Sequence, residues 1–184
     1  MRIIAGSARS LPLKTIEGID TRPTTDRIKE TLFNMLNPVI AGCTFLDLFA
    51  GSGQIGLEAV SRGARHAVFV ENNRKASNCI QENIAFTRFN EECTLLSMEA
   101  VSAIRRMEGK YVFDVVFMDP PYQKGMEEEV LRTLADSSVI NEESVIIVEA
   151  AQDTDFSYLS ELGYRITKEK RYKTNMHVFL QHEA

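Results

Sequence analysis

The sequence lacks the features that would place the protein in a membrane or a secretory pathway. No run of about 18 apolar residues occurs, so we expect no membrane-spanning helix. Residues 1–6 show neither the apolar segment nor the cleavage site of a secretory signal. Apolar residues make up 44% and charged residues 26% of the 184-residue chain, which is typical of a globular protein. These observations predict one water-soluble domain that works in the cytoplasm.

Cysteine and histidine, the usual ligands of structural metals, are also scarce. The three cysteines are widely spaced and form no Cys-x-x-Cys pair, which is typical of reduced thiols in a cytosolic protein. The three histidines are scattered along the chain. Because a metal centre needs several such ligands close together, we expect no metal site.

Positive charge is in the minority, since the whole chain has a net charge of −5. Its distribution is uneven, however: residues 1–29 carry +3, residues 165–175 carry +4, and the rest of the chain carries −12. Two basic segments on an acidic body are consistent with ordinary solvated surface. Only further motifs can indicate whether these segments also bind nucleic acid.

The middle of the chain alternates short segments of β-forming residues with segments of helical periodicity. This alternation predicts an α/β fold with a parallel sheet. The last two strands lie only a few residues apart, so we expect them to pair antiparallel. The expected strands cover residues 43–49, 66–71, 93–98, 111–119, 144–149, 164–171 and 176–181. The expected helices cover residues 54–62, about 76–84, 100–107, 127–135 and 156–162.

A different segment, residues 1–38, precedes this core. Residues 3–5 and 11–15 flank a Gly-Ser turn and predict a small hairpin. The chain contains no low-complexity linker and no internal repeat. We therefore expect residues 1–38 to be an extension of a catalytic core, residues 39–184, within a single domain.

A helix is expected directly before the core. Thr24 and Thr25 favour a helix start, and an apolar stripe follows as far as Leu36. Asn37-Pro38 should end this helix, because proline disfavours a helical conformation in the residue before it.

Three glycines follow the first strand of the core. Gly51, Gly53 and Gly56 fit the pattern G-x-G-x-x-G, in which a tight turn leads from a strand into a helix. Glu71 ends the next strand 18 residues after Gly53, where an acid can bind ribose hydroxyls. The pattern serves any adenosine-bearing cofactor, so a nicotinamide-dinucleotide enzyme is an open alternative on this segment alone.

An acid near the end of the first strand favours one of these cofactors. Asp47 should lie close to the cofactor, where its charge would repel a pyrophosphate and attract the ammonium and sulfonium groups of S-adenosylmethionine. Glu71 would then bind the ribose diol, and Glu99, after the third strand, would accept from the adenine amino group. Glu99 could equally be an acid that stabilises a helix start.

The tetrapeptide Asp119-Pro120-Pro121-Tyr122 follows the most apolar strand. Two prolines remove two backbone donors and hold the turn extended, which leaves the Asp119 carboxylate and the Pro120 carbonyl as acceptors. Such a site suits the exocyclic amino group of a base, because accepting its protons exposes the nitrogen lone pair to a methyl donor. Tyr122 offers a ring on which an extruded base can stack. A plain rigid connection with a packed tyrosine is the alternative interpretation.

Several stretches resemble one family, the RsmD-type 16S ribosomal RNA guanine-N2 methyltransferases. The resemblance spans most of the chain, from residues 2–6 through the block 22–34 to the glycine loop and its helix, residues 47–64. The tetrapeptide 119–122 alone would not separate this family from DNA adenine-N6 methyltransferases. The block from Arg22-Pro23-Thr24-Thr25-Asp26-Arg27 to Asn34 does so.

The resemblance implies a Rossmann-like class I S-adenosylmethionine-dependent methyltransferase fold, with a seven-stranded, mostly parallel sheet and an antiparallel last strand. It implies that a guanine of small-subunit ribosomal RNA is flipped into a catalytic site at Asp119, Pro120, Pro121 and Tyr122. For S-adenosylmethionine it implies contacts by Asp47, Phe49, Ala50, Gly51, Ser52, Gly53, Glu71, Asn72, Glu99 and Ala100, with Arg22 and Thr24 beside them.

Beside these motifs the basic segments become candidates for RNA binding. We expect a monomer that acts on ribosomal RNA within the small subunit. The candidate RNA contacts are Arg2, Arg9, Arg27, Lys170 and Arg171.

The sequence departs from the family pattern at two places. Glu99 stands where aspartate is commoner, and residues 173–177 lack an expected glycine.

Two further alternatives are open, one of them within the methyltransferases. A DNA or RNA adenine-N6 methyltransferase would share the tetrapeptide, but the chain has no separate domain for reading DNA sequence. A binding module without catalytic activity would share the fold and the cofactor loop.

Overall fold

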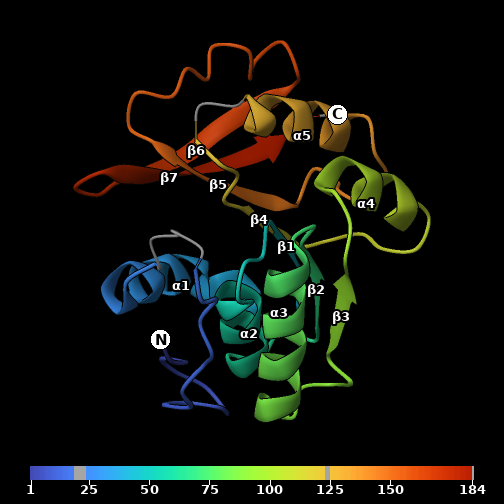
Figure 1. Cartoon of the computed structure of the whole chain (residues 1–184). Helices are drawn as coiled ribbons and strands as arrows, with labels where there is room; N and C mark the ends of the chain where they lie inside the picture. Colours follow the sequence, from blue (N-terminus) through green and yellow to red (C-terminus); the bar gives the residue numbers. More distant parts are fainter. Residues whose placement is uncertain (19–23, 123–124, 184) are drawn as a thin grey trace.

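The computed structural model describes residues 1–18, 24–122 and 125–183 of the chain (Figure 1). These residues form a single sheet of seven strands with helices on both faces. In this described part of the chain, no helix is long and apolar enough to cross a membrane.

The sheet is the predicted mostly parallel one. Its strands are β1 (Thr44–Leu48), β2 (His66–Val70), β3 (Cys93–Leu96), β4 (Val115–Met118), β5 (Val145–Ala151), β6 (Tyr164–Arg171) and β7 (Asn175–His182). Their order is β3-β2-β1-β4-β5-β7-β6. Strands β1 to β5 pair in parallel, whereas β7 is antiparallel to both β5 and β6. The chain reverses its direction of winding between β1 and β4, which is where open α/β sheets bind their ligands.

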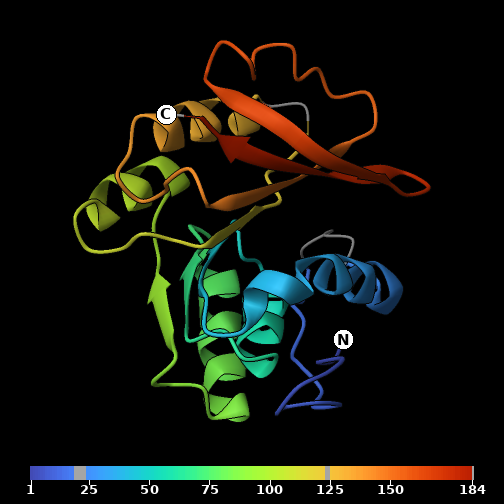
Figure 2. The same cartoon turned by 180° about the vertical axis from the view of Figure 1, so that it is seen from behind.

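Two hydrophobic cores lie on opposite faces of this sheet. The helices are α1 (Asp26–Ile40), α2 (Gln54–Ser61), α3 (Arg74–Thr87), α4 (Ala100–Met107) and α5 (Met126–Ala135). Helices α1, α2 and α3 pack on one face and α4 and α5 on the other, as Figures 1 and 2 show from opposite sides. Neighbouring residues of β1 alternate between the cores, with Phe45 in the first and Leu46 in the second. Strand β4, which is covered on both faces, is apolar throughout, as the sequence indicated for residues 111–119.

Two expectations for helices are wrong: one helix is longer than expected, and another does not form. Helix α1 continues through Pro38 to Ile40, and Ile40 is buried in the first core. Proline removes one helical hydrogen bond near the end of the helix, and the packing of Ile40 and Leu36 offsets that loss. Residues 156–162 form turns in place of the expected helix, with hydrogen bonds from the Leu159 amide to the Phe156 carbonyl and from the Leu162 amide to the Leu159 carbonyl.

Two expected strands are shorter or absent. The expected hairpin is reduced to a single antiparallel bridge between Arg2 and Pro12, supported by a hydrogen bond from the Ile3 amide to the Leu11 carbonyl. Proline cannot donate to a ladder, so the pairing does not extend. Strand β4 begins at Val115, because the preceding Phe113 amide bonds to the Val139 carbonyl, outside the sheet.

The extension is held to the core by three charged side chains, which we call the N-terminal clasp: the buried Lys29 and Glu58 and the partly buried Arg62. The Glu58 carboxylate accepts hydrogen bonds from the amides of Ile4 (2.8 Å) and Ala5 (3.1 Å) and from Arg62 Nε (2.9 Å). Lys29 Nζ lies 3.6 Å from Glu58 Oε1, and both side chains are completely buried. The clasp therefore joins α1, α2 and the first residues of the chain.

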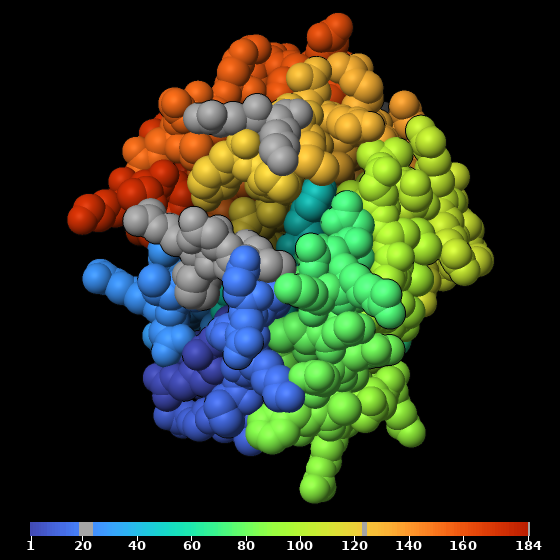
Figure 3. Space-filling model, in the orientation of Figure 1, coloured from blue at the N-terminus to red at the C-terminus, as the bar shows by residue number. Residues whose placement is uncertain are grey.

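Close packing adds to the clasp along the same segment. A side chain on Gly6 would come within 1.8 Å of the Ser61 carbonyl oxygen, so only glycine fits against the end of α2. Further along, the buried Asn83 of α3 bonds to both backbone groups of Lys14. Figure 3 shows the N-terminal segment, in blue, lying beside α3, in green.

Candidate functional site

The glycine loop turns sharply between β1 and α2. Phe49, Gly51 and Gly53 all have positive φ angles, of 61°, 59° and 85°. Gly53 precedes the first helical residue and caps the helix without a side chain. A side chain on Gly56 would come within 2.4 Å of the Phe69 ring, so this glycine lets α2 pack closely on β2. The loop thus has the strand–turn–helix geometry that the sequence pattern predicted.

Asp47 lies beneath this loop. It is almost fully buried, and its Oδ2 atom accepts a hydrogen bond of 3.0 Å from the Gly56 amide. Burial raises the pKa of Asp47 to about 7, the Gly56 bond opposes that shift, and the nearby Glu71 carboxylate adds to it. Asp47 therefore fixes the start of α2 and can hold a proton near neutral pH.

Glu71 ties the loop to the end of β2. One of its carboxylate oxygens accepts from the Gly51 amide at 3.0 Å, and the other accepts from the Asn73 amide at 2.8 Å. Each oxygen keeps a second lone pair for a ligand. These two bonds hold the Glu71 side chain in place at the edge of the sheet.

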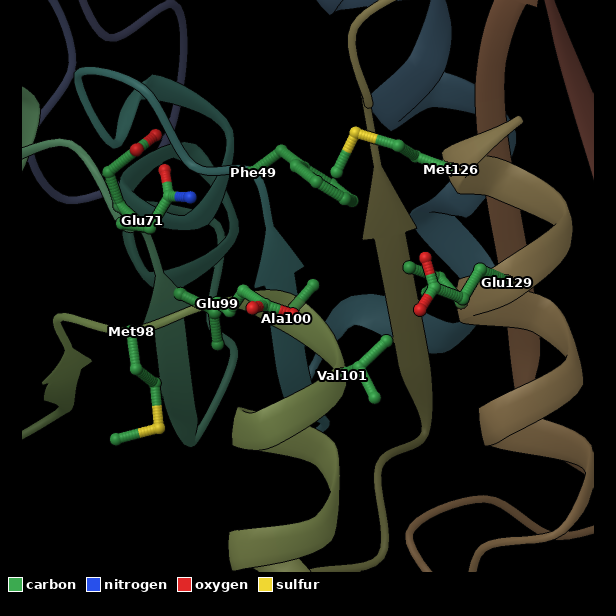
Figure 4. Close-up of a pocket in the computed structure, with 11 residues that line it drawn as sticks. Phe49, Glu71, Met98, Glu99, Ala100, Val101, Met126 and Glu129 are labelled. Carbon is green, nitrogen blue, oxygen red and sulfur yellow. The ribbon is translucent and has the colours of Figure 1, made fainter. Parts of the chain in front are cut away.

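A pocket opens next to Glu71, between the ends of β1 and β2 and the helices α4 and α5 (Figure 4). Figure 4 shows Glu71 and Glu99 on one side of it, opposite Met126 and Glu129. Glu99 stands at the N-cap of α4, yet its side chain makes no capping hydrogen bond. Its charge lies at the positive end of the α4 dipole, as the alternative interpretation requires. Five of the predicted cofactor residues line the pocket: Phe49, Glu71, Asn72, Glu99 and Ala100.

The sequence did not identify the rest of the pocket wall. The missed residues come from the end of β2, from the start of α4 and above all from α5, which begins directly after the tetrapeptide 119–122. Proximity of α5 to that motif was a signal, but only the fold shows which side of the helix turns inward. The missed residues are Val70, Met98, Val101, Met126, Glu129 and Val130.

Other predicted cofactor residues lie outside this pocket wall. Asp47 is buried under the loop, and Ala50, Gly51, Ser52 and Gly53 form the loop itself. Thr24 is half-buried just before α1 and does not line the pocket. Arg22 lies outside the described residues.

The basic residues proposed for RNA lie on two elements, the N-terminal extension and the edge strand β6. Arg2 pairs with Asp26 at 3.0 Å, and Arg9 and Arg27 of the extension are exposed. Lys170 and Arg171 are exposed at the end of β6. The turn between β6 and β7 lies on the same side of the molecule as α1 in Figures 1 and 2.

The predicted catalytic tetrapeptide leaves the sheet at its carboxyl edge. Asp119 comes directly after β4 and is partly buried, Pro120 is buried, and Pro121 and Tyr122 are exposed. Burial, followed by the charges of Glu149 and Asp47, raises the pKa of Asp119 well above its usual value of 3.8. Three carboxylates from β1, β4 and β5 therefore share one region, where a positive or proton-donating ligand would be favoured.

The third of these carboxylates, Glu149, was missed by the sequence analysis. It is buried on β5 and accepts from Asn175 Nδ2 at 2.7 Å, and His177 Nε2 lies 3.2 Å from its other oxygen. His177 is completely buried on β7 and stacks edge-on against Phe117. No local motif surrounds Glu149 in the sequence, so only the pairing of β5 with β7 reveals this arrangement.

With this geometry in place, the chain can be compared with known proteins. Residues 1–181 match the model of the family described as "Conserved hypothetical protein 95". The chain belongs to this family. A relative from Escherichia coli (strain K12), "Ribosomal RNA small subunit methyltransferase D", is 38% identical over 150 residues, which cover 82% of this chain and 74% of the relative. The protein of the same name from Haemophilus influenzae is 34% identical over 92% of this chain and 88% of its own length.

A solved structure supports the same conclusion. The Escherichia coli protein named "Putative methyltransferase yhhF" has a TM-score of 0.85 and 35% identity, with 100% of this chain and 98% of that chain covered. The resemblance to RsmD-type enzymes is thereby confirmed, as are the methyltransferase fold and membership of a methyltransferase family.

Proposed function

We propose that the protein transfers a methyl group from S-adenosylmethionine to the exocyclic N2 of a guanine in small-subunit ribosomal RNA. The observation that carries this proposal is the Asp119-Pro120-Pro121-Tyr122 turn, which has a partly buried carboxylate and an exposed ring at the carboxyl edge of the sheet. The pocket lined by Glu71 and Glu99 lies at the same edge. The names of the relatives, which specify small-subunit ribosomal RNA, support the choice of substrate.

The pocket fits S-adenosylmethionine by its chemistry. Glu71 and Glu99 supply carboxylate acceptors for a ribose diol and an adenine amino group, and the side chains of Phe49, Met98 and Val101 supply apolar walls. Acidic lining disfavours the pyrophosphate of a nicotinamide dinucleotide and favours a cation. When bound, S-adenosylmethionine supplies a methyl group on a positively charged sulfur.

Asp119 would perform the proton chemistry. The amino group of guanine is a weak nucleophile, because its lone pair is delocalised into the ring. In our proposal the Asp119 carboxylate and the Pro120 carbonyl accept hydrogen bonds from its two N–H groups, which frees the lone pair for attack. The lone pair forms the new N–C bond while the S–C electron pair stays on sulfur. The nitrogen then gives one proton to Asp119, whose raised pKa suits it to take that proton. Tyr122 would stack against the extruded base.

Recognition of the RNA would use both basic surfaces. Arg9, Arg27 and Lys170 are exposed and would bind phosphates, and Arg2 and Arg171 would exchange their carboxylate partners, Asp26 and Glu169, for phosphates. A compact domain of this size can take its specificity from the folded small subunit. We propose that it acts there as a monomer.

The identity of the methylated base tests the proposal. The protein is incubated with S-adenosylmethionine labelled in the methyl group and with small ribosomal subunits from a strain that lacks its own enzyme, and the nucleosides are then separated. We expect the label in N2-methylguanosine. Label in N6-methyladenosine would assign the protein to the adenine enzymes instead. Calorimetry with S-adenosylmethionine and with NADH provides the control, because binding of NADH alone would overturn the proposed cofactor.

A further inference from the structure

A buried polar group lies behind the proposed catalytic carboxylate and takes no part in the chemistry described above. It consists of Glu149, His177, Asn175 and Tyr172. His177 Nε2 and Asn175 Nδ2 each contact one oxygen of Glu149, at 3.2 Å and 2.7 Å. The Tyr172 hydroxyl lies 3.4 Å from the other ring nitrogen of His177. Since Glu149 and His177 are 6% and 0% exposed, water does not screen this group.

The register of the sheet places Glu149 beside Asp119. Met118 of β4 pairs with Val148 of β5, so the next residues along these parallel strands are Asp119 and Glu149. Neighbouring strands lie about 4.8 Å apart, and paired residues point to the same face. Phe117, two residues before Asp119 and on the same face, contacts the His177 ring edge-on with centroids 5.9 Å apart.

Both oxygens of Glu149 are already occupied by protein donors. Its carboxylate therefore cannot turn toward a ligand without breaking the bonds to Asn175 and His177. A buried carboxylate held in this way acts on its surroundings through its charge. That charge acts on Asp119, the neighbouring residue on the adjacent strand.

We propose that Glu149 is a positioning residue for methyl transfer, which His177 and Asn175 hold beside Asp119 so that its negative charge strengthens Asp119 as an acceptor of the amino protons. The inference rests on the proposed function of Asp119. It requires a charge on Glu149, whose two oxygens contact His177 Nε2 and Asn175 Nδ2.

Other charged groups around Asp119 act in the same direction or stand too far out to oppose it. Asp47 on β1 also raises the pKa of Asp119, though less than Glu149 does. Tyr172, whose pKa burial and Glu149 raise to about 12, stays neutral. Lys170 pairs with His177 in the register of β6 and β7, but it is exposed to solvent.

The variant Glu149→Gln tests this proposal, because it keeps the size and hydrogen-bonding capacity of the side chain and removes its charge. Asp119 must be ionised to accept protons, so methyl transfer rises with pH through the pKa of Asp119. Without the charge of Glu149 that pKa falls. In single-turnover assays at saturating S-adenosylmethionine, we expect the acid limb of the pH–rate profile to move down by about one pH unit or more. A purely structural role would lower the rate equally at every pH.

A second measurement does not depend on activity. Carbon-13 NMR of aspartate carboxyl groups, with the Asp119 signal assigned by its loss in Asp119→Asn, should show a lower titration midpoint for Asp119 in Glu149→Gln than in the wild type. An unchanged midpoint would overturn the inference even if the methylated base proves to be guanine. Conversely, methylation of another base would overturn the proposed substrate and leave this titration valid.

A matched variant separates the charge from the packing around it. In His177→Gln, the amide nitrogen can replace Nε2 as donor to Glu149, so we expect the Asp119 midpoint to stay close to that of the wild type. A midpoint that falls as far as in Glu149→Gln would contradict the assignment of the effect to the Glu149 charge. Thermal unfolding and cofactor binding of each variant show whether it is folded.

Discussion

Buried acidic residues occur in two parts of this protein, with opposite surroundings. In the N-terminal clasp, Glu58 is completely buried but receives two backbone amides, Arg62 and the buried Lys29. At the carboxyl edge of the sheet, Asp47 and Asp119 form no ion pair with a lysine or arginine of the described residues. The first acid is neutralised by its neighbours, whereas the others are left with raised pKa values.

The contrast separates a structural role from a functional one. A carboxylate that is paired with cations and backbone amides joins chain segments, as Glu58 does for α1, α2 and residues 4–5. Carboxylates left without cations cost stability at neutral pH, and such a cost is typical of sites that bind cations or move protons. The predictions below test this difference, from the largest expected effect to the smallest.

Removal of Glu58 should have the largest effect. Glu58→Ala leaves the Lys29 ammonium buried without its partner, although burial already lowers the pKa of Lys29, and deprives two amides of their acceptor. We expect a loss of about 3–5 kcal/mol in the free energy of unfolding, measured with urea. The control is Glu82→Ala, which breaks the exposed pair with Lys14 and should cost far less stability, because water screens an exposed pair. Equal losses in the two variants would contradict the clasp.

Asp47→Asn should raise the stability of the protein relative to the wild type as the pH increases, because it removes a buried charge that has no cationic partner. Below pH 3.8, its usual pKa, Asp47 is protonated in both the folded and the unfolded protein. Between about pH 4 and about pH 7, only the unfolded chain releases the proton. The contribution of Asp47 to stability therefore falls across this window and is constant above it. Relative to Asp47→Asn, the wild type should lose about 2–4 kcal/mol between pH 4 and pH 8.

The same variant should bind S-adenosylmethionine more weakly at pH 8, because it lacks the charge that attracts the sulfonium and ammonium groups. Calorimetry at that pH measures the loss. A variant that shows parallel stability curves and unchanged cofactor affinity would assign Asp47 a purely structural role, like that of Glu58.

The smallest effect concerns the edge strand. Replacing Lys170 and Arg171 by alanine should weaken RNA binding and reduce the slope of log affinity against log salt by about 0.7–0.9 for each phosphate that the variant no longer binds. The control replaces two consecutive exposed arginines on α4, Arg105 and Arg106, by alanine, which should leave the slope unchanged. Equal slopes for the two double variants would contradict a role of Lys170 and Arg171 in phosphate binding.

Much of the fold could be predicted because it depends on local patterns. The parallel strands are mostly apolar, and the sequence has glycine at positions 51 and 53, where the loop needs positive φ angles. The extent of α1 past Pro38 could not be predicted in this way. It depends on the burial of Ile40 in a core that forms only when distant segments meet.

Candidate site residues could be chosen from the sequence where they follow strand ends, as Glu71, Glu99 and Asp119 do, and the structure places Glu71 and Glu99 in one pocket. It was missed where a contact joins segments far apart in sequence: Met126 reaches the pocket from α5, and His177 meets Glu149 across 28 residues. The clasp contact between Lys29 and Glu58 is of the same kind. Strand register and helix docking, which fix these contacts, have no signature in the neighbouring residues.

The most direct test of the account is the effect of Asp119→Ala on catalysis and on cofactor binding, measured separately. We predict that single-turnover methyl transfer falls by a factor on the order of 10² or more, the size typical of losing one group that stabilises a transition state. S-adenosylmethionine should still bind with nearly wild-type affinity by calorimetry, and the exposed Asp136→Ala should change neither quantity. Transfer by Asp119→Ala at close to the wild-type rate would contradict the assignment of this carboxylate to catalysis.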